Sequence, residues 1–223
     1  MENKDRLDLP YEIARKAIHI SSLSIPLIYW HISRELALLI LLPLFAGFFF
    51  VDLLKNFVKP VSGWYHRTFD SMLREHELQT GKIQFNGATC IMVSAVILVF
   101  FFPKIIAVAS FSMVAVSDTF ASVVGKTLGR HRFGKKSIEG SIAFFVTAIA
   151  VVLFVPGLDW RIGLAMAAAG TVTEAFVAAI GNYRIDDNLT IPIASAALGM
   201  ICYHLFLPGD IPFLDVIPEC CLH

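Results

Sequence analysis

Apolar residues gather into seven long stretches along the chain, and charged or turn-forming residues separate each stretch from the next. A helix needs about 20 mostly apolar residues to cross the hydrocarbon core of a bilayer. The first and fifth stretches are shorter, so they are expected to tilt or to extend into their polar flanks. The stretches run approximately over Ala17–Trp30, Leu36–Phe57, Ile83–Phe102, Ile105–Val124, Ser141–Val155, Ile162–Ile180 and Leu189–Leu207. The pattern predicts an all-α, polytopic transmembrane helix bundle of about seven spans, with residues 1–223 forming a single domain.

The composition also indicates an integral membrane protein. The chain has 223 residues, of which 57% are hydrophobic and only 16% are charged. Soluble domains carry about 25% charged residues, so this composition is too apolar for an ordinary soluble domain. The first ten residues carry both signs of charge and no signal-peptide cleavage pattern follows, so the first stretch is expected to remain as a span. The four cysteines lack metal-ligand spacing and are expected to be structurally inert.

Positive charge is distributed unevenly between the two sides of the predicted bundle. With seven spans, the segments on the side of the N-terminus hold fifteen of the 18 lysines and arginines. The opposite side holds Arg34, Lys104 and Arg161. Because lysine and arginine accumulate in cytoplasmic loops, the N-terminus is expected to be cytoplasmic and the C-terminus to lie outside.

The fourth apolar stretch contains the acid Asp118 and the sixth contains Glu174. Acids inside spans are costly and usually face a partner or a functional cavity. On a helix, Asp118 shares a face with Ala121 and Gly125, and Glu174 shares a face with Thr171. Helices with small residues on one face can approach each other closely. The two carboxylates are therefore expected to share one site.

A glycine-punctuated cationic loop follows Asp118. It contains Lys126, Arg130, Arg132, Lys135 and Lys136 among Gly125, Gly129 and Gly134, and Ser137, Glu139 and Gly140 close it. Carboxylates bind divalent cations, basic side chains neutralise phosphate oxygens, and glycines let backbone N–H groups approach closely. The stretch therefore predicts a site for a metal-bound polyphosphate. It is not a P-loop, because Phe120 stands where that motif requires its first glycine.

Two segments on the same side have open interpretations. Arg15, Lys16 and His19 lead into the first stretch, either as cations at a membrane interface or as support for a substrate. The segment Lys55–Lys82 mixes aromatic and charged residues and is expected to form an interfacial amphipathic helix.

Two of the later stretches open with polar residues. Asn86–Thr89 supplies small and hydroxyl side chains, which are expected to pack near the site. Asp187 and Asn188 provide either oxygen ligands or a helix N-cap, and the sequence leaves both readings open.

The most specific part of this chain resembles the signature of the CTP-dependent lipid kinases. Residues 117–129 read Ser-Asp-Thr-x-Ala-x-x-x-Gly-x-x-x-Gly, and residues 135–141 read Lys-Lys-Ser-x-Glu-Gly-Ser. The Arg15-Lys16-x-x-His19 entry, the Glu174 segment and the residues 187–192 follow in the family's order. The group includes dolichol kinases, phytol kinases and yeast-type diacylglycerol kinases, and it is related to phosphatidate cytidylyltransferases. The chain is short compared with dolichol kinases.

The resemblance implies transfer of the γ-phosphoryl group of CTP to a membrane lipid alcohol, which could be a polyprenol, a phytol-like isoprenoid or diacylglycerol. It implies a Mg²⁺ cofactor and an active site on the cytoplasmic side of a cell inner membrane or ER-type membrane. The implied catalytic residues are Asp118, Lys135, Lys136 and Glu139. The implied nucleotide-binding residues are Gly125, Gly129, Arg130, Arg132, Ser137, Gly140 and Asn188. The implied metal ligands are Asp118, Glu174 and Asp187, and Arg15, Lys16 and His19 are assigned to the substrate or to structural support. Glu139 either holds a basic side chain in place or acts as a base.

Two other functions would use some of the same acidic and basic residues. A cytidylyltransferase would transfer CMP to phosphatidic acid at a similar metal–triphosphate site. A small transporter would use Asp118 and Glu174 as an ion path, but five cations in one loop have little use there. The expected partners are CTP, the lipid alcohol and the bilayer, with no nucleic acid, and a homo-oligomer is compatible with the sequence.

Overall fold

The computed structural model describes residues 17, 19–58, 60–63, 85–134, 136–177 and 186–212. The main helices in this part of the chain are α2 (Ser24–His31), α3 (Arg34–Phe57), α5 (Gly87–Phe101), α6 (Lys104–Thr127), α7 (Ile138–Phe154), α8 (Trp160–Val177) and α9 (Asp187–Phe206). Between α6 and α7, β1 (Arg132–Phe133) and β2 (Lys136–Ser137) pair antiparallel as a short hairpin. Each expected apolar stretch thus overlaps one of these main helices, and the described part of the fold is mostly helical.

Polar side chains mark where several helices begin. Ser33, Asn86, Ser137 and Asp186 each accept a hydrogen bond from a backbone N–H in the first turn of α3, α5, α7 and α9, respectively. Such a cap satisfies one of the N–H groups that a helix leaves without an internal partner. These caps fix the entry points of four helices from local sequence alone.

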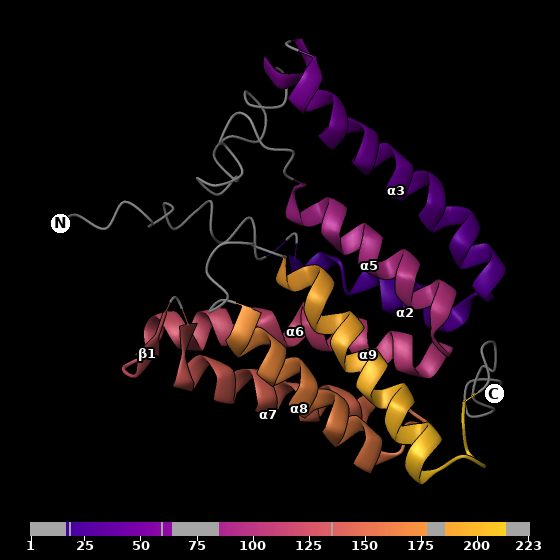
Figure 1. The fold of residues 1–223 in the computed structure, drawn as a ribbon, viewed down its shortest axis with the longest axis vertical. Coiled ribbons are helices and arrows are strands. Elements are labelled where there is room, and N and C mark those ends of the chain that lie inside the picture. Colours follow the sequence, from indigo (N-terminus) through magenta and orange to yellow (C-terminus); the bar gives the residue numbers. More distant parts are fainter. Residues whose placement is uncertain are drawn as a thin grey trace.

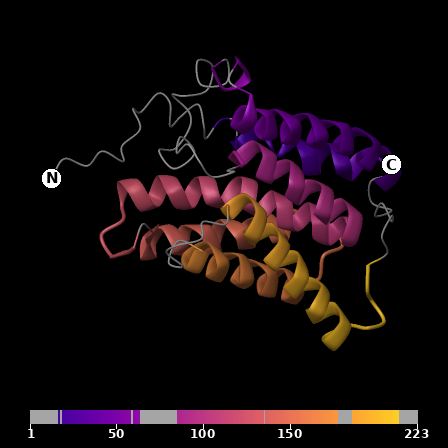
Figure 2. The same cartoon turned by 45° about the horizontal axis from the view of Figure 1, so that its top comes forward.

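Helix α6 is the centre of the bundle. It contacts α2, α5, α7, α8 and α9, and every residue from Lys104 to Ala115 is buried. Helix α3 lies at the edge and packs on α5 (Figure 1). The apolar core of α3 is only 17% buried inside the protein, against 78% for α6. The turned view shows α7, α8 and α9 on the side of α6 away from α3 (Figure 2). The bundle therefore surrounds α6 and leaves α3 largely exposed.

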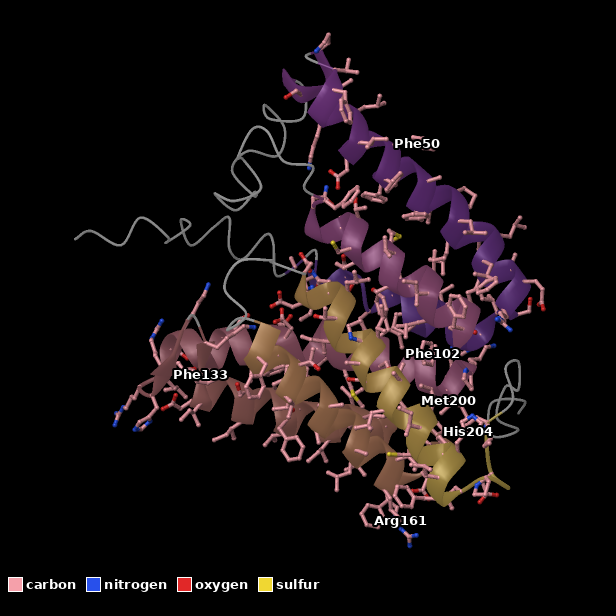
Figure 3. The ribbon with its side chains drawn as sticks, in the orientation of Figure 1. Phe50, Phe102, Phe133, Arg161, Met200 and His204 are labelled. Atoms are coloured by element: carbon pink, nitrogen blue, oxygen red, sulfur yellow. The ribbon has the colours of Figure 1, made fainter. Side chains whose placement is uncertain are left out.

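Within the part of the chain that the structure describes, three helices are long and apolar enough to cross a membrane: Arg34–Lys55 within α3, and the whole of α6 and α9. Helices α5 and α7 are apolar but shorter. Large apolar side chains project outward, including Leu39 and Leu153, which are both 70% exposed. Figure 3 shows Phe50 pointing from α3 away from the bundle. These features support a membrane protein, while the count of seven spans and the orientation stay predictions.

Two details differ from the sequence expectation. The hairpin adds a small antiparallel sheet to the predicted all-α fold, and Gly134 occupies its turn with φ of +58°. The stretch Ala17–Trp30 is not one continuous helix, because a turn at residues 22–23 precedes α2. The Ser22 hydroxyl donates to the His19 carbonyl oxygen, and Pro26 has no N–H to donate to the Ser22 carbonyl. Local side-chain chemistry thus interrupts the helix.

Candidate functional site

Lys136 on β2 connects the hairpin with two helices. Its Nζ lies 2.7 Å from Glu174 Oε1 on α8 and 3.2 Å from Asp187 Oδ2 on α9. Glu174 is only 2% exposed, and its second oxygen accepts a hydrogen bond of 2.9 Å from the Ser141 hydroxyl on α7. Oxygen and nitrogen atoms gather beside the first turn of α9 (Figure 3). One polar cluster therefore ties together the hairpin, α7, α8 and α9.

The negative charge of Asp118 on α6 also stabilises the charged form of the Lys136 ammonium group. Burial by itself lowers the pKa of Lys136, but the negative charges of Asp187, Asp118 and Glu174 outweigh it and raise that pKa above its usual value. An opposite charge nearby favours the charged form of a titrating group. Carboxylates from α6, α8 and α9 thus converge on one lysine, and Asp118 and Glu174 serve the same site.

His19 approaches Asp118 from the segment before α2. Its Nε2 lies 3.5 Å from Asp118 Oδ2 and 3.2 Å from the carbonyl oxygen of Val114. Both neighbours are acceptors, so this geometry assigns the hydrogen to Nε2. The ring is 8% exposed. His19 is therefore placed to orient the Asp118 carboxylate.

Gly125, Gly129 and Gly140 surround the hydroxyl of Ser137. A Cβ added at these glycines would lie 2.9, 2.8 and 3.1 Å, respectively, from Ser137 Oγ. The same oxygen accepts a hydrogen bond of 3.1 Å from the Gly140 N–H and caps α7. The glycines thus let the end of α6 pack directly against the start of α7. These glycines allow close approach between two segments of the chain itself, and their expected role in approaching a nucleotide stays a prediction.

Glu139 in the first turn of α7 lies beside the segment that contains Arg130 and Arg132. The Glu139 carboxylate accepts a hydrogen bond of 3.1 Å from the His131 backbone N–H and lies 2.8 Å from His131 Nδ1. Both arginines are exposed. Of the two roles left open by the sequence for Glu139, holding a basic side chain agrees with these contacts.

At the start of α9, one acid caps the helix and the next acid pairs with Lys136. Asp186 accepts a 2.8 Å hydrogen bond from the Asn188 N–H, so the N-cap is Asp186 and neither Asp187 nor Asn188. Asp187 can therefore pair with Lys136. A Cβ on Gly87 would lie 3.4 Å from Asn188 Nδ2, so the start of α5 packs beside this turn.

Several predicted features lie outside the described residues: Arg15, Lys16, Lys135, most of the segment Lys55–Lys82 and the Cys220–Cys221 pair. Neither of the described cysteines, Cys90 and Cys202, is part of a disulfide.

Sequence reasoning missed Asp52 on α3. This side chain is 0% exposed, and its Oδ1 lies 2.8 Å from Lys55 Nζ. Its Oδ2 accepts hydrogen bonds of 2.7 Å from the Asn86 N–H and the Thr89 hydroxyl. Asp52 thus fixes the start of α5 against α3. The available signal was an acid within an apolar span, the criterion that singled out the acids of α6 and α8.

The carboxylates can be tested against a metal ion. Among the residues that the structure describes, no group of three or more His, Cys, Asp or Glu side chains forms a ready-made metal site. Magnesium is commonly bound by one or two carboxylates, with water and substrate phosphates completing its octahedron. Asp118, Glu174 and Asp187 offer only oxygen donors around a single cation. This donor set fits a hard cation that arrives together with a polyphosphate.

Known proteins match most of the chain. Residues 9–183 match the model of the Cytidylyltransferase family. The chain is 30% identical to CTP-dependent diacylglycerol kinase 1 of Schizosaccharomyces pombe, over 84% of this chain and 92% of that protein. It is 28% identical to the Saccharomyces cerevisiae protein of the same name, over 83% and 71% of the two chains. Uncharacterized protein RP860 of Rickettsia prowazekii is 26% identical, over 84% and 92%. No solved structure matches the chain.

Proposed function

The chain belongs to the cytidylyltransferase family and is related to its CTP-dependent lipid kinases, and from this premise we propose that it phosphorylates diacylglycerol with CTP. The hydroxyl oxygen of diacylglycerol attacks the γ-phosphorus, and the bond from that phosphorus to the β–γ bridging oxygen breaks. The hydroxyl proton passes to a carboxylate of the site. The products are phosphatidic acid and CDP.

The observation that carries this proposal is the convergence of three carboxylates on Lys136 beside a basic hairpin. Phosphoryl transfer depends mainly on positioning and on neutralising phosphate charge. Asp118 would hold Mg²⁺, with Glu174 or Asp187 assisting. The ion, when bound with the nucleotide, neutralises negative charge on the phosphates.

The basic residues of the hairpin region are proposed to neutralise the phosphate groups of the nucleotide. In the proposal, Lys136 and Lys135 neutralise the β- and γ-phosphates, and the exposed Arg130 and Arg132 assist at the edge of the hairpin. Lys136 neutralises the nearby carboxylates in the described structure. A metal–nucleotide complex supplies both an alternative cation for those acids and an alternative anion for the lysine.

The choice of diacylglycerol follows the named activity of the yeast relatives, and polyprenols and phytol-like alcohols are the alternatives. The N-terminus and the site are proposed to lie on the cytoplasmic side, because fifteen lysines and arginines against three favour that orientation. This is also the side on which CTP is available.

The test is product analysis with the purified protein in detergent micelles. CTP or ATP labelled at the γ-phosphate is offered with diacylglycerol, phytol or a polyprenol. The proposal expects label from CTP in phosphatidic acid, release of CDP, and loss of transfer when EDTA removes the metal. Absence of CTP-dependent labelling of any alcohol would overturn it.

Transfer of CMP to phosphatidic acid is the second candidate, and the description of the family model favours it. It would use the same carboxylates but place the attack on the α-phosphorus. CTP labelled at the α-phosphate separates the two reactions. Label in the lipid with release of pyrophosphate identifies CMP transfer, whereas label in CDP identifies the kinase.

A further inference from the structure

A cavity of about 360 Å³ lies between α2, α3 and α5. Its walls include Ile28 of α2, Ile40 and Leu44 of α3, and Ile91 of α5. Ligand pockets typically measure roughly 300–1,000 Å³ and are mostly apolar. Ile28 and Ile40 remain 54% and 45% exposed, so the cavity opens toward the outer surface of the bundle. A ligand could enter it sideways from a bilayer.

The walls change in polarity along the helices. Ser21, Ser22 and Ser24 line the cavity before and at the start of α2, and Ile32 lines it just beyond the end of α2. No charged residue is among the side chains that line this cavity. A nucleotide triphosphate is therefore a poor occupant, because burying unpaired phosphate charge is expensive. An amphiphile with one hydroxyl-bearing end suits this gradient.

The depth of the cavity matches one leaflet of a bilayer. Its lining residues on α3 extend from Ala37 to Phe48, which corresponds to about 16 Å at 1.5 Å per residue. The hydrocarbon core of a bilayer is about 30 Å thick, so one leaflet contributes about half of that. This depth suits a single acyl chain of a lipid in the same leaflet as the site.

The serine end of the cavity borders the carboxylate site. Ser22 Oγ donates a 2.6 Å hydrogen bond to the carbonyl oxygen of His19, whose ring lies 3.5 Å from Asp118. On the other wall, Ala88 lines the cavity directly after Gly87, which packs beside Asn188. A chain seated in the cavity would thus end next to the groups proposed to bind the nucleotide.

We infer that this cavity, called here the acyl cavity, holds one acyl chain of the lipid acceptor so that its hydroxyl reaches Asp118. The inference rests on the proposed function, because it assigns the acceptor side of that same site. It also favours diacylglycerol over polyprenols, because a polyprenol chain far exceeds the depth of one leaflet.

Photo-crosslinking tests occupancy without requiring catalysis. Wild-type protein in phosphatidylcholine nanodiscs, without CTP, is irradiated with diacylglycerol that carries a diazirine in one acyl chain. We expect labelled peptides containing Ile28, Ile40 or Leu44, and we expect excess unlabelled diacylglycerol to suppress this labelling at least fivefold. Equal labelling around Val146 and Leu153 on the exposed face of α7, without competition, means annular bilayer lipid only and overturns the inference. Competition by polyprenol but not by diacylglycerol also overturns it.

A matched pair of variants on α3 tests whether occupancy matters for turnover. Ile40→Trp narrows the acyl cavity, whereas Leu39→Trp places the same ring on the adjacent outward position, which does not line it. We expect Ile40→Trp to raise the KM for diacylglycerol at least fivefold with an unchanged KM for CTP, and Leu39→Trp to change neither. Equal effects of the two variants, or no effect of Ile40→Trp, would contradict the inference.

These experiments distinguish failure of the acyl-cavity inference from failure of the proposed kinase activity. Competed labelling without CTP-dependent phosphorylation of any alcohol would support the acyl cavity as a lipid site and overturn the proposed kinase activity. Phosphorylation of diacylglycerol without competed labelling would support the kinase activity and overturn the acyl cavity.

Discussion

The lysines at the two ends of helix α6 have opposite kinds of partner. At its N-terminus, Lys104 is 1% exposed, donates a 2.7 Å hydrogen bond to the Ile32 carbonyl oxygen and lies 5.1 Å from the ring centroid of Tyr29. At its C-terminal end, Lys136 of the hairpin meets carboxylates from α6, α8 and α9. In Figure 3, Phe133 marks the hairpin end and Arg161 marks the opposite end.

At the Lys104 end, the cations satisfy backbone groups. Ile32 is the C-cap of α2, and Arg34 donates to the carbonyl oxygens of Val99 and Phe100 in the last turn of α5. Helices leave their last carbonyls without internal partners, and basic side chains there are favourable. These contacts explain why the helices end where they do, and they join both cations to backbone carbonyl oxygens and aromatic rings.

At the Lys136 end, carboxylates of α6, α8 and α9 gather around one ammonium group. Three carboxylates around one ammonium cost free energy unless the charges are neutralised. Such clusters are typical of functional sites, where charge is held for a ligand. The difference between the two ends predicts that charge-neutral substitutions will separate activity from stability.

The largest effect on activity is expected from Asp118→Asn. This change keeps the size of the side chain and removes the charge proposed to bind the metal–nucleotide complex. Turnover with γ-labelled CTP should fall by at least about 100-fold, as losses of electrostatic stabilisation commonly do. The thermal unfolding midpoint should change little. Turnover close to that of the wild type would show that Asp118 does not bind the metal.

Lys136→Met should reduce both activity and stability. It leaves Glu174, 2% exposed, next to Asp187 and Asp118 without their shared cation. Removing one partner of a buried pair commonly costs about 3–5 kcal/mol, and the 22% exposure of the Lys136 side chain favours the lower end. Turnover should drop at least about tenfold. Lys136→Arg is the control, because it keeps the charge and should recover most of the stability.

The pH dependence of Lys136 gives a separate test. Its pKa in the folded protein lies above the usual 10.5, so its stabilising contribution is fully present below that pH. The contribution is lost as the pH rises through the folded-state pKa. The difference in unfolding free energy between wild type and Lys136→Met should therefore be constant between about pH 8 and 10 and shrink above 10.5. A difference that grows at high pH would contradict the charge network.

A smaller effect is expected from Glu139→Gln in the first turn of α7. The change weakens the contacts that hold His131 and should lower kcat/KM for CTP by about threefold, because a contact between partly exposed side chains contributes little. His131→Ala should have a similar effect. The double variant should be no worse than either single variant, because both changes remove the same interaction. Additive losses would indicate separate roles for the two side chains.

The smallest effect on activity is expected from Lys104→Met at the opposite end. Unfolding free energy should fall by about 1–3 kcal/mol, because the Ile32 carbonyl loses a charged hydrogen-bond donor. The kcat/KM for CTP should stay within about twofold of the wild type, since the carboxylates around Lys136 gather toward the opposite end of α6. A large loss of turnover in folded protein would remove the contrast between the two ends.

The helices could be predicted from the sequence because apolar length and capping residues are local signals. The expected stretch Leu36–Phe57 corresponds to α3, and the expected stretch Ile105–Val124 lies within α6. The break before α2 was missed, because it depends on the Ser22 hydroxyl and Pro26 acting against an apolar pattern. Span number cannot be read from apolar length alone when several helices are short or buried by their neighbours.

The site residues could be chosen from the sequence, but their pairing could not. An acid inside an apolar span stands out, so Asp118 and Glu174 were found, whereas Asp52 was overlooked on the same criterion. The pairing of Lys136 with Glu174 joins residues 38 positions apart and depends on how α8 packs against the hairpin. The role of Asp186 as the cap of α9 also needed coordinates, because three neighbouring polar residues could all have capped it.

The most direct test of the contrast between the two ends is the affinity for Mg²⁺–CTP, measured by equilibrium dialysis with purified wild type, Asp118→Asn, Lys136→Met and Lys104→Met. The account predicts that the first two variants bind at least about tenfold more weakly than the wild type, which corresponds to about 1.4 kcal/mol, while Lys104→Met binds equally well. Equal affinity in all four proteins would contradict it and would place the nucleotide elsewhere on the molecule.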